Sequence, residues 1–279
     1  MREIAASKIT DTVARLCKDA NFYLPEDVVR SIASAYKTET SESGKEILGQ
    51  LIENAKIAQT KNIPLCQDTG ITDVFVKIGQ EVRVTGGLLG DAVNKGVALG
   101  YSQGYLRKSV VSDPLERKNT GDNTPASIYS EVVPGDKIEF TVLPKGGGSE
   151  NTSAVRMLVP SAGWDGVKDF VLQTVRAAVN ACPPMVVGVG IGGSFSSVAL
   201  LAKKALLRKI GTDNKLTFYD MQERDLLKEI NKTGIGPMGL GGITTALAVH
   251  IETAPCHIAS LPVAVSIQCH SCRRITEVI

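Results

Sequence analysis

The chain has 279 residues, of which 43% are hydrophobic and 22% are charged, and its formal net charge is +2. This balance is typical of a globular chain and excludes an intrinsically disordered one, and six cysteines are too few for a disulfide scaffold. The dispersed basic residues give no indication of a nucleic-acid surface, and no apolar run reaches the ~20 residues that a membrane span needs. The first residues lack the apolar core of a secretory signal, so we expect a cytoplasmic protein with reduced thiols.

The first 60 residues predict an amino-terminal layer of helices. Apolar residues recur with a spacing near 3.6 from Ile9 to Leu16, over 20–36, and again from Ser43 to Ala58. Pro25-Glu26-Asp27 is a favourable first turn for the second of these helices. We expect this part to be scaffold, because nothing in it suggests chemistry.

Residues 61–279 mix predicted strands with predicted helices. In chain order the patterns predict a strand at 73–79, a helix at 90–106, a long polar connection at 107–135, a strand at 137–144, a helix at 164–181, a strand leading into a loop at 185–193, helices at 194–209 and 219–232, and short strands at 244–252 and 262–268. We therefore expect a mixed α/β protein of the α+β class, in which the helical layer packs around one or two mostly antiparallel or mixed sheets.

Three loops share one design, in which an apolar or glycine-rich approach leads to an isolated cysteine with polar neighbours. They are PLCQDTG around Cys66, NACPPMVVGVGIGG around Cys182, and SIQCHSCRR around Cys269. This wide spacing does not fit the local cysteine pairs of zinc fingers or ferredoxins, but it fits a metal site assembled from three loops with one open coordination position. The alternative is that each cysteine is a small buried hydrophobic residue. The Cys269-x-x-Cys272 pair could also be half a zinc site or a redox couple.

Polar residues near these loops are candidates for catalysis and substrate binding. Asp68 could be a general acid or base, or it could close an Asx turn on Gly70. Arg107 and Lys145 open polar or glycine-rich loops and could bind carboxylates, for which the planar guanidinium is better suited. The glycine-rich runs, including a partial dinucleotide-binding pattern at 188–193, could approach an anion or could simply form tight turns.

Eight motifs, in order along the chain, resemble those of one family, the alpha subunits of two-subunit iron–sulfur (class I) fumarate hydratases. They are PLCQDTG (64–70), YLRKSVV (105–111), NTGDNTP (119–125), KGGGSEN (145–151), NACPPMVVGVGIGG (180–193), GIGPMGLGG (234–242), HIETAPCHIASLPV (250–263) and CHSCRR (269–274). On this basis residues 1–279 are expected to form a single hydro-lyase alpha-subunit domain, with 1–60 as its helical part and 61–279 as its cluster- and substrate-binding part.

The resemblance implies a [4Fe–4S] cluster whose fourth iron is open to substrate. By motif, the three ligands are Cys66, Cys182 and Cys269, whereas Cys256 and Cys272 are not ligands. The resemblance also implies catalytic roles for two residues, Asp68 and His257. It implies substrate-binding roles for Gln67, Arg107 and Gly146. Lys145, which opens the glycine-rich loop, is a further candidate for substrate binding.

The implied activity is the reversible hydration of fumarate to L-malate, a reaction of the tricarboxylic acid cycle on a small dicarboxylate. PLCQDTG and KGGGSEN favour this reaction over the alternative, an L-tartrate dehydratase alpha subunit. A non-catalytic metal-binding module is the alternative from a different class. The family's remaining arginines, lysine and threonine base have no counterpart here, so the resemblance implies a separate beta subunit, with α2β2 as the simplest assembly.

Overall fold

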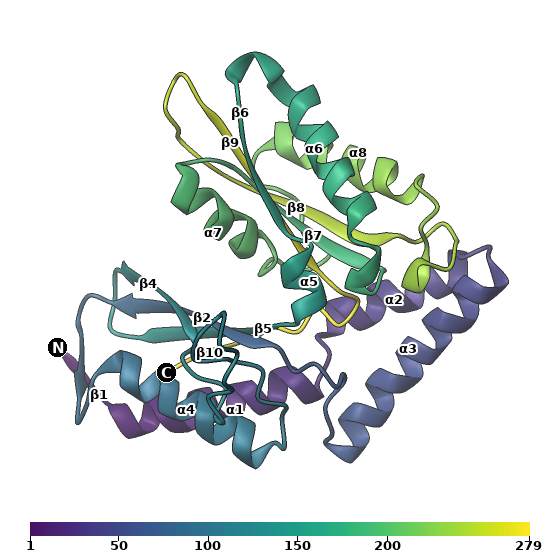
Figure 1. Ribbon diagram of the computed structural model, residues 1–279. Helices are drawn as coiled ribbons and strands as arrows, with labels where there is room; N and C mark the ends of the chain where they lie inside the picture. Colours follow the sequence, from purple (N-terminus) through teal and green to yellow (C-terminus); the bar gives the residue numbers. More distant parts are fainter. The chain divides into compact units, whose positions relative to one another are not determined.

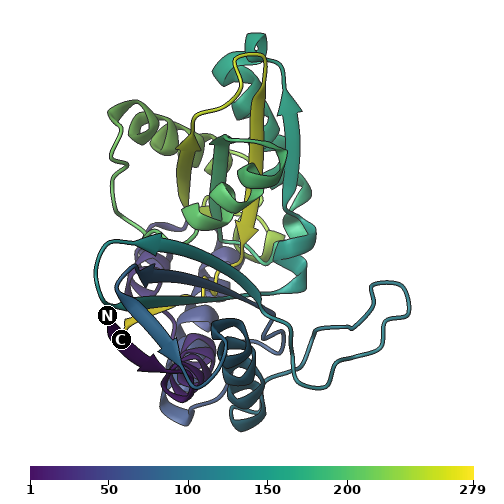
Figure 2. The same cartoon turned by 90° about the vertical axis from the view of Figure 1, so that its left-hand side faces the viewer.

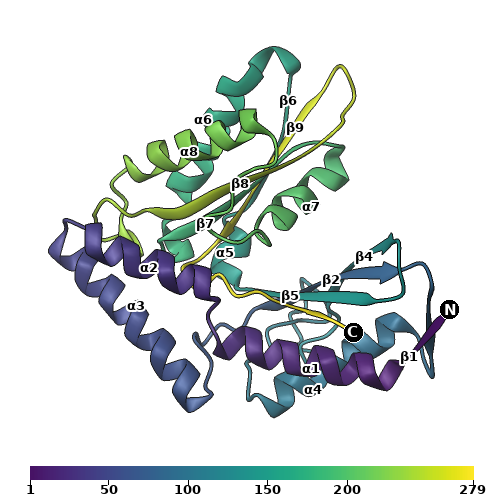
Figure 3. The same ribbon diagram turned by 180° about the vertical axis from the view of Figure 1, so that it is seen from behind.

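The computed structural model describes residues 1–279, which divide into two compact units (Figure 1; Figure 3). The first unit comprises Met1–Pro25, Ala55–Gly147 and Arg273–Ile279, and the second comprises Glu26–Asn54 and Gly148–Cys272. None of the helices combines the length and the apolar character that a membrane crossing requires.

The first unit is built on a four-stranded mixed sheet with the order β10-β5-β2-β4. Its strands are β2 (Ile71–Gly79), β4 (Ser127–Val133), β5 (Ile138–Lys145) and β10 (Ile275–Val278). Only β2 and β4 run parallel. A small parallel sheet pairs β1 (Arg2–Ala5) with β3 (Val82–Thr85). Helices α1 (Ala6–Phe22) and α4 (Leu89–Gln103) pack together below the larger sheet in Figure 1, and their apolar faces share one core with it.

The second unit is built on a four-stranded mixed sheet with the order β6-β9-β7-β8. Its strands are β6 (Ala154–Leu158), β7 (Met185–Gly192), β8 (Ala246–Ala254) and β9 (Leu261–Gln268). Helix α7 (Phe195–Ala205) covers one face, and α6 (Gly163–Ala177) and α8 (Thr217–Asn231) cover the other (Figure 1). The unit also contains α2 (Glu26–Thr38), most of α5 (Gly147–Asn151) and the beginning of α3 (Glu42–Lys61).

Two glycines of the GVGIGG run explain how α7 approaches β7. A Cβ at Gly188 would lie 2.2 Å from the carbonyl oxygen of Ala202, and one at Gly190 would lie 2.4 Å from that of Val198. Because real Cβ atoms do not come so close, a side chain at either position would push α7 away from the sheet. The first two glycines of the partial dinucleotide-binding pattern are therefore explained by the close contact of α7 with strand β7. The tight turns that were the alternative explanation begin only after these two residues.

The predicted α+β class with mixed sheets is confirmed. The five predicted strands correspond to β2, β5, β7, β8 and β9, and the predicted helices overlap α1 to α4 and α6 to α8. The prediction that 107–135 is only a connection is wrong, because the segment contains β4. This edge strand is half-exposed, and its serines and glutamate concealed it in the sequence. The remaining loop, 107–126, stands out from the first unit in Figure 2.

The predicted amino-terminal helical layer is divided between the units. Helix α1 lies in the first unit, α2 lies in the second, and α3 begins in the second unit and ends in the first. That the two units together form one hydro-lyase domain stays a prediction.

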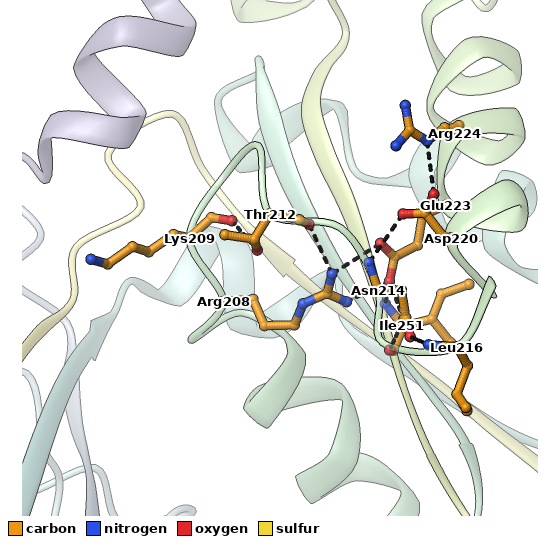
Figure 4. A network of polar contacts seen from close by, with 9 residues as sticks. All are labelled: Arg208, Lys209, Thr212, Asn214, Leu216, Asp220, Glu223, Arg224 and Ile251. Carbon is orange, nitrogen blue, oxygen red and sulfur yellow. Dashed lines mark hydrogen bonds and ion pairs between the residues drawn. The ribbon is translucent and has the colours of Figure 1, made fainter.

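A polar network ties the connection between α7 and α8 to strand β8 (Figure 4). Glu223, only 6% exposed, accepts hydrogen bonds from both terminal nitrogens of Arg208. One of its oxygens also accepts from the side chain of Asn214 and from the amide of Ile251, each at 2.7 Å. A buried carboxylate is stable only when it is paired and hydrogen-bonded, and here the pairing holds the second unit together.

Replacing this carboxylate should destabilise the second unit. In Glu223→Gln the new amide group would face donors, so we expect a loss of roughly 2–4 kcal/mol, or about 5–10 °C in the thermal midpoint. Glu229→Gln on the same helix is the matched control, because Glu229 forms a more exposed pair with Lys232 and should change the midpoint by less than about 2 °C. Equal midpoints for the two variants would show that the network contributes nothing.

Candidate active site

The loop that carries Cys66 connects α3 to β2 and is fixed at several points within the first unit. The amide of Leu65 donates to the carbonyl oxygen of Asn21 at 2.9 Å. Thr69 donates through its hydroxyl to the carbonyl oxygen of Arg107 at 2.8 Å, and Tyr101 donates to that of Thr69 at 2.7 Å. Burial raises the pKa of Tyr101, which keeps this hydroxyl a donor. The loop is therefore held to α1, to α4 and to the segment after α4.

Three of the predicted site residues line one cavity of about 310 Å³ in the first unit. They are Cys66, Gln67 and Arg107, and the wall is completed by Ile63, Pro64, Thr69 and Tyr105. Cys66 is half-buried, whereas Gln67 and Arg107 are exposed. The cavity wall thus includes a cysteine, a glutamine and an arginine, which are residue types that suit a carboxylate held next to a sulfur-bound metal.

Asp68 forms an Asx turn, which the sequence allowed as the alternative to a role as general acid or base. Its Oδ1 accepts the amide of Gly70 at 3.0 Å, and its Oδ2 accepts the amide of Gly147 at 2.7 Å. Gly70 has a φ of +75°, and a Cβ there would lie 2.6 Å from the carbonyl of Lys145, so no other residue fits. A Cβ at Gly146 would lie 3.0 Å from Oδ2 of Asp68. The turn is formed, and any acid–base role of Asp68 comes in addition to it.

Lys145 is the last residue of β5, and its side chain is fully buried in the first unit. The glycine-rich segment begins at the next residue, Gly146, so Lys145 precedes that segment from the end of the strand. The residue does not line the cavity that contains Arg107.

In the second unit the structure brings Cys182 and Cys269 to the same end of the sheet. Cys182 precedes β7 and Cys269 follows β9, and these strands pair antiparallel with Val186 opposite Gln268. His270 joins the two loops, because its amide donates to the carbonyl oxygen of Cys182 at 3.3 Å. Cys182 is exposed and Cys269 is half-buried. Both thiols are therefore within reach of a ligand at this end.

His257 lies at the opposite end of that sheet. It follows β8, which runs parallel to β7, so the eight residues of β7 separate it from the Cys182 end by roughly 25 Å. Its side chain is exposed, and its Nδ1 accepts the amide of Ala259 at 3.1 Å. Cys256, also exposed, lies in the same turn. The structure thus does not bring His257 together with Cys182 and Cys269 within this unit.

The other two cysteines are inaccessible. Cys17 and Cys272 are both fully buried, and burial raises the pKa of the Cys17 thiol to about 12. A thiol with so high a pKa is a poor metal ligand. Nowhere in the structure do three or more His, Cys, Asp or Glu side chains form a metal-binding group, and Cys66 belongs to a different unit from Cys182 and Cys269.

The two residues that follow the glycine-rich loop at 234–242 bind a carboxylate of the protein itself. The carboxylate of Glu39 accepts the amides of Ile243 and Thr244 at 3.0–3.1 Å. Burial alone would raise the pKa of Glu39, but hydrogen bonds from Ile243, Ser41 and Thr244, among others, together hold that pKa below its usual value. The loop is therefore anchored structurally at its end, in the second unit.

Sequence reasoning missed Arg273, which is only 1% exposed in the first unit. Its Nη1 donates to the side-chain oxygen of Asn21 at 2.8 Å and to the carbonyl oxygen of Asp68 at 2.9 Å. Arginines are usually at the surface, so only its place in the CHSCRR motif could have singled it out.

Comparison with known proteins agrees with the motifs. A family model described as fumarate hydratase (Fumerase) matches residues 10–278. A Methanocaldococcus jannaschii protein provisionally named L(+)-tartrate dehydratase subunit alpha is 47% identical over 274 residues, which cover 96% of each chain. The L(+)-tartrate dehydratase subunit alpha of Escherichia coli K12 is 36% identical over 279 residues, which cover 99% of this chain and 92% of the relative.

These matches define the class of protein as a hydro-lyase subunit. The chain belongs to the class I fumarate hydratase family and corresponds to its alpha subunit. Enzymes of this family are in general iron–sulfur proteins.

Proposed function

We propose that the chain is the cluster-bearing alpha subunit of a cytoplasmic enzyme that hydrates fumarate reversibly to L-malate. One observation carries the proposal, namely that Cys66, Gln67 and Arg107 line a single cavity. A dicarboxylate gripped there by the guanidinium would lie beside the thiolate that we propose as a cluster ligand. The assignment of the reaction to the tricarboxylic acid cycle follows from the same proposal.

We propose that three thiols of the chain hold a [4Fe–4S] cluster. We propose Cys66, Cys182 and Cys269, because these three are accessible and two of them share one end of the second sheet. Cys17 and Cys272 are fully buried, and Cys256 lies at the other end with His257. When bound, such a cluster supplies a Lewis-acidic iron that polarises an oxygen of the substrate.

The remaining residues bind the substrate and move its proton. Arg107 is proposed to hold one carboxylate in a bidentate manner, and Gln67 to donate a hydrogen bond to the substrate from the same cavity wall. Gly146 is proposed to leave room for substrate beside Asp68, since a side chain there would reach within 3.0 Å of the carboxylate. Lys145 is retained as a proposed substrate-binding residue that would act from its buried position.

Asp68 is proposed to transfer a proton during turnover in addition to closing its turn. In Asp68→Asn, one oxygen remains for the Asx turn but the basic carboxylate is lost, so we expect turnover to fall by ~10²–10⁴-fold. The matched control is Asp113→Asn, because Oδ1 of Asp113 also closes a turn in the same unit, where it accepts the amides of Leu115 and Glu116. Asp113→Asn should keep full turnover. Normal turnover of Asp68→Asn would mean that the turn is the whole role of Asp68.

His257 is proposed to be a catalytic residue that serves the site of another alpha chain. This follows because His257 lies at the opposite end of its own sheet from Cys182 and Cys269, whereas an α2β2 enzyme contains two alpha chains. Inactive His257→Asn and Cys66→Ser chains should therefore regain partial turnover when mixed and reassembled. If the mixture stays inactive while each chain reassembles with unmodified chains into active enzyme, this role is wrong.

The partner is proposed to be a beta subunit, because the relatives named above are called subunit alpha. A symmetric α2β2 assembly is the simplest that two such chains can form. The beta subunit would supply the second carboxylate clamp, since Arg107 is the only arginine in the wall of the Cys66 cavity.

A second candidate function is the dehydration of L(+)-tartrate, which the names of both relatives favour. Both substrates are C4 diacids, so one site could accept either of them. Anaerobic turnover of the reconstituted complex with fumarate, L-malate and L(+)-tartrate separates the two functions. We expect the highest kcat/KM with fumarate or malate. A higher value with tartrate would establish the second function, and no turnover of any diacid would favour a non-catalytic metal-binding module.

A further inference from the structure

We propose that Arg273 is a positioning residue that holds the Cys66–Gln67 segment in the conformation needed for ligand and substrate binding. The inference deepens the proposed function and rests on it for the roles of Cys66 and Gln67. Its evidence is the geometry around the guanidinium in the first unit.

The segment in question lies between two anchors. On one side, the amide of Leu65 donates to the carbonyl oxygen of Asn21 at 2.9 Å. On the other side, the carbonyl oxygen of Asp68 accepts a hydrogen bond from Nη1 of Arg273 at 2.9 Å. Cys66 and Gln67 are the only two residues between these points, so their backbone path depends on both anchors.

One guanidinium nitrogen connects the two anchors. Nη1 of Arg273 also donates to Oδ1 of Asn21 at 2.8 Å. Asn21 and Asp68, the two anchoring residues, therefore accept hydrogen bonds from the same nitrogen. Asn21 is fully buried, and its own amide group donates to the carbonyl oxygen of Cys17 in the preceding turn of α1. Arg273 thus connects the loop that carries Cys66 to helix α1 by hydrogen bonds.

The charge of Arg273 is buried although both acceptors of its Nη1 are neutral. Arg273 is 1% exposed, its two Nη1 acceptors are neutral oxygens, and its Nε has no hydrogen-bond partner. Such an arrangement is costly for stability, because a buried cation normally requires an ionised partner. Nη2 lies 3.8 Å from the point where a Cβ of Gly146 would stand, next to the carboxylate of Asp68.

The sequence places this contact close to a second proposed ligand. Only three residues of the sequence separate Arg273 from Cys269. A lysine at position 273 would keep the charge but lose the planar Nη1 amino group, whose two N–H bonds point in fixed directions toward Asn21 and Asp68.

The direct test measures the reactivity of Cys66 in the metal-free chain. Arg273→Lys and the unmodified chain are alkylated with iodoacetamide, and the rate at each cysteine is followed by mass spectrometry of its peptide. We expect Cys66 to react about tenfold faster in Arg273→Lys, a factor equivalent to ~1.4 kcal/mol. Buried Cys17 reports global opening and should not change, and exposed Cys256 should react equally in both chains.

Two further variants keep the test decisive. Asn21→Ala removes one acceptor of Nη1 and should accelerate Cys66 in the same direction, whereas Arg274→Lys, at the adjacent buried arginine, should not. An unchanged Cys66 rate in both Arg273→Lys and Asn21→Ala would overturn the proposal. So would an acceleration that Cys17 shares, because it would show a role in stability alone.

A second measurement uses the cluster-loaded chain. Arg273→Lys should lose iron to a chelator several-fold faster than the unmodified chain, and the assembled enzyme should show a lower kcat at an unchanged thermal midpoint. If the chain bound no iron, the proposed function would fail while the alkylation result still decided the role of Arg273. If iron loss and kcat were both unchanged, the positioning role would be wrong even with a mobile Cys66.

Discussion

We expect each of the substitutions Cys66→Ser, Cys182→Ser and Cys269→Ser to remove bound iron from the anaerobically reconstituted chain and to lower turnover by roughly three orders of magnitude. The expected size follows from the several kcal/mol that a Lewis-acidic metal contributes to such a reaction. A thiolate ligand cannot be replaced by a hydroxyl, which is a harder and far less acidic donor. The measurement is iron and sulfide content per chain, together with turnover of the complex.

The other three cysteines provide the controls. Cys256→Ser is the closest match to Cys182→Ser, because both side chains are exposed in loops of the second unit. Cys272→Ala and Cys17→Ala test buried thiols, and each should keep its iron even where the thermal midpoint falls. Iron loss in Cys272→Ala combined with iron retention in Cys269→Ser would overturn the proposed ligand set.

The cluster-loaded alpha chain alone is expected to turn over fumarate at least ~10²-fold more slowly than the complex with the proposed beta subunit. Arg107 is the only arginine in the wall of the Cys66 cavity, whereas a dicarboxylate presents two charges that must be held. A missing acid–base group alone costs ~10²–10⁴-fold. Purifying the chain with and without a co-expressed beta subunit, at equal iron content, measures the difference.

The interface between the two subunits gives an independent readout of the same prediction. An obligate interface should bury on the order of 2,000 Å² or more, so the complex should survive dilution and gel filtration. Comparable turnover of the two preparations would show that the alpha chain contains a complete site, and the proposed division of labour would then be wrong.

The regular elements could be predicted from the sequence because their signals are local. Strand β7 reads as an unbroken apolar run, and α1 and α8 repeat their apolar residues at helical spacing. Strand β4 could not be predicted, because it is held at the sheet edge by pairing with β2, and that partner lies some 50 residues earlier in the chain. Its half-exposed surface requires no apolar pattern.

The candidate site could be predicted only in part, for a related reason. Motifs singled out Cys66, Gln67 and Arg107, and the structure places all three around one cavity. The burial of Lys145 and the two contacts of Arg273 depend on which strands and loops meet in space, and nothing local in the sequence reports this. The distance of His257 from the Cys182 end likewise follows from the direction of β8 relative to β7.

The most direct test of the account is the response of the iron to substrate. The alpha chain is loaded anaerobically with ⁵⁷Fe, combined with the beta subunit, and examined by Mössbauer spectroscopy before and after addition of L-malate. We predict that one iron in four changes its signal, because only the iron without a protein ligand is open to the substrate. A spectrum that neither L-malate nor L(+)-tartrate alters, or a colourless chain that retains zinc instead of iron, would contradict the assignment of this chain as the cluster-bearing subunit of a hydro-lyase.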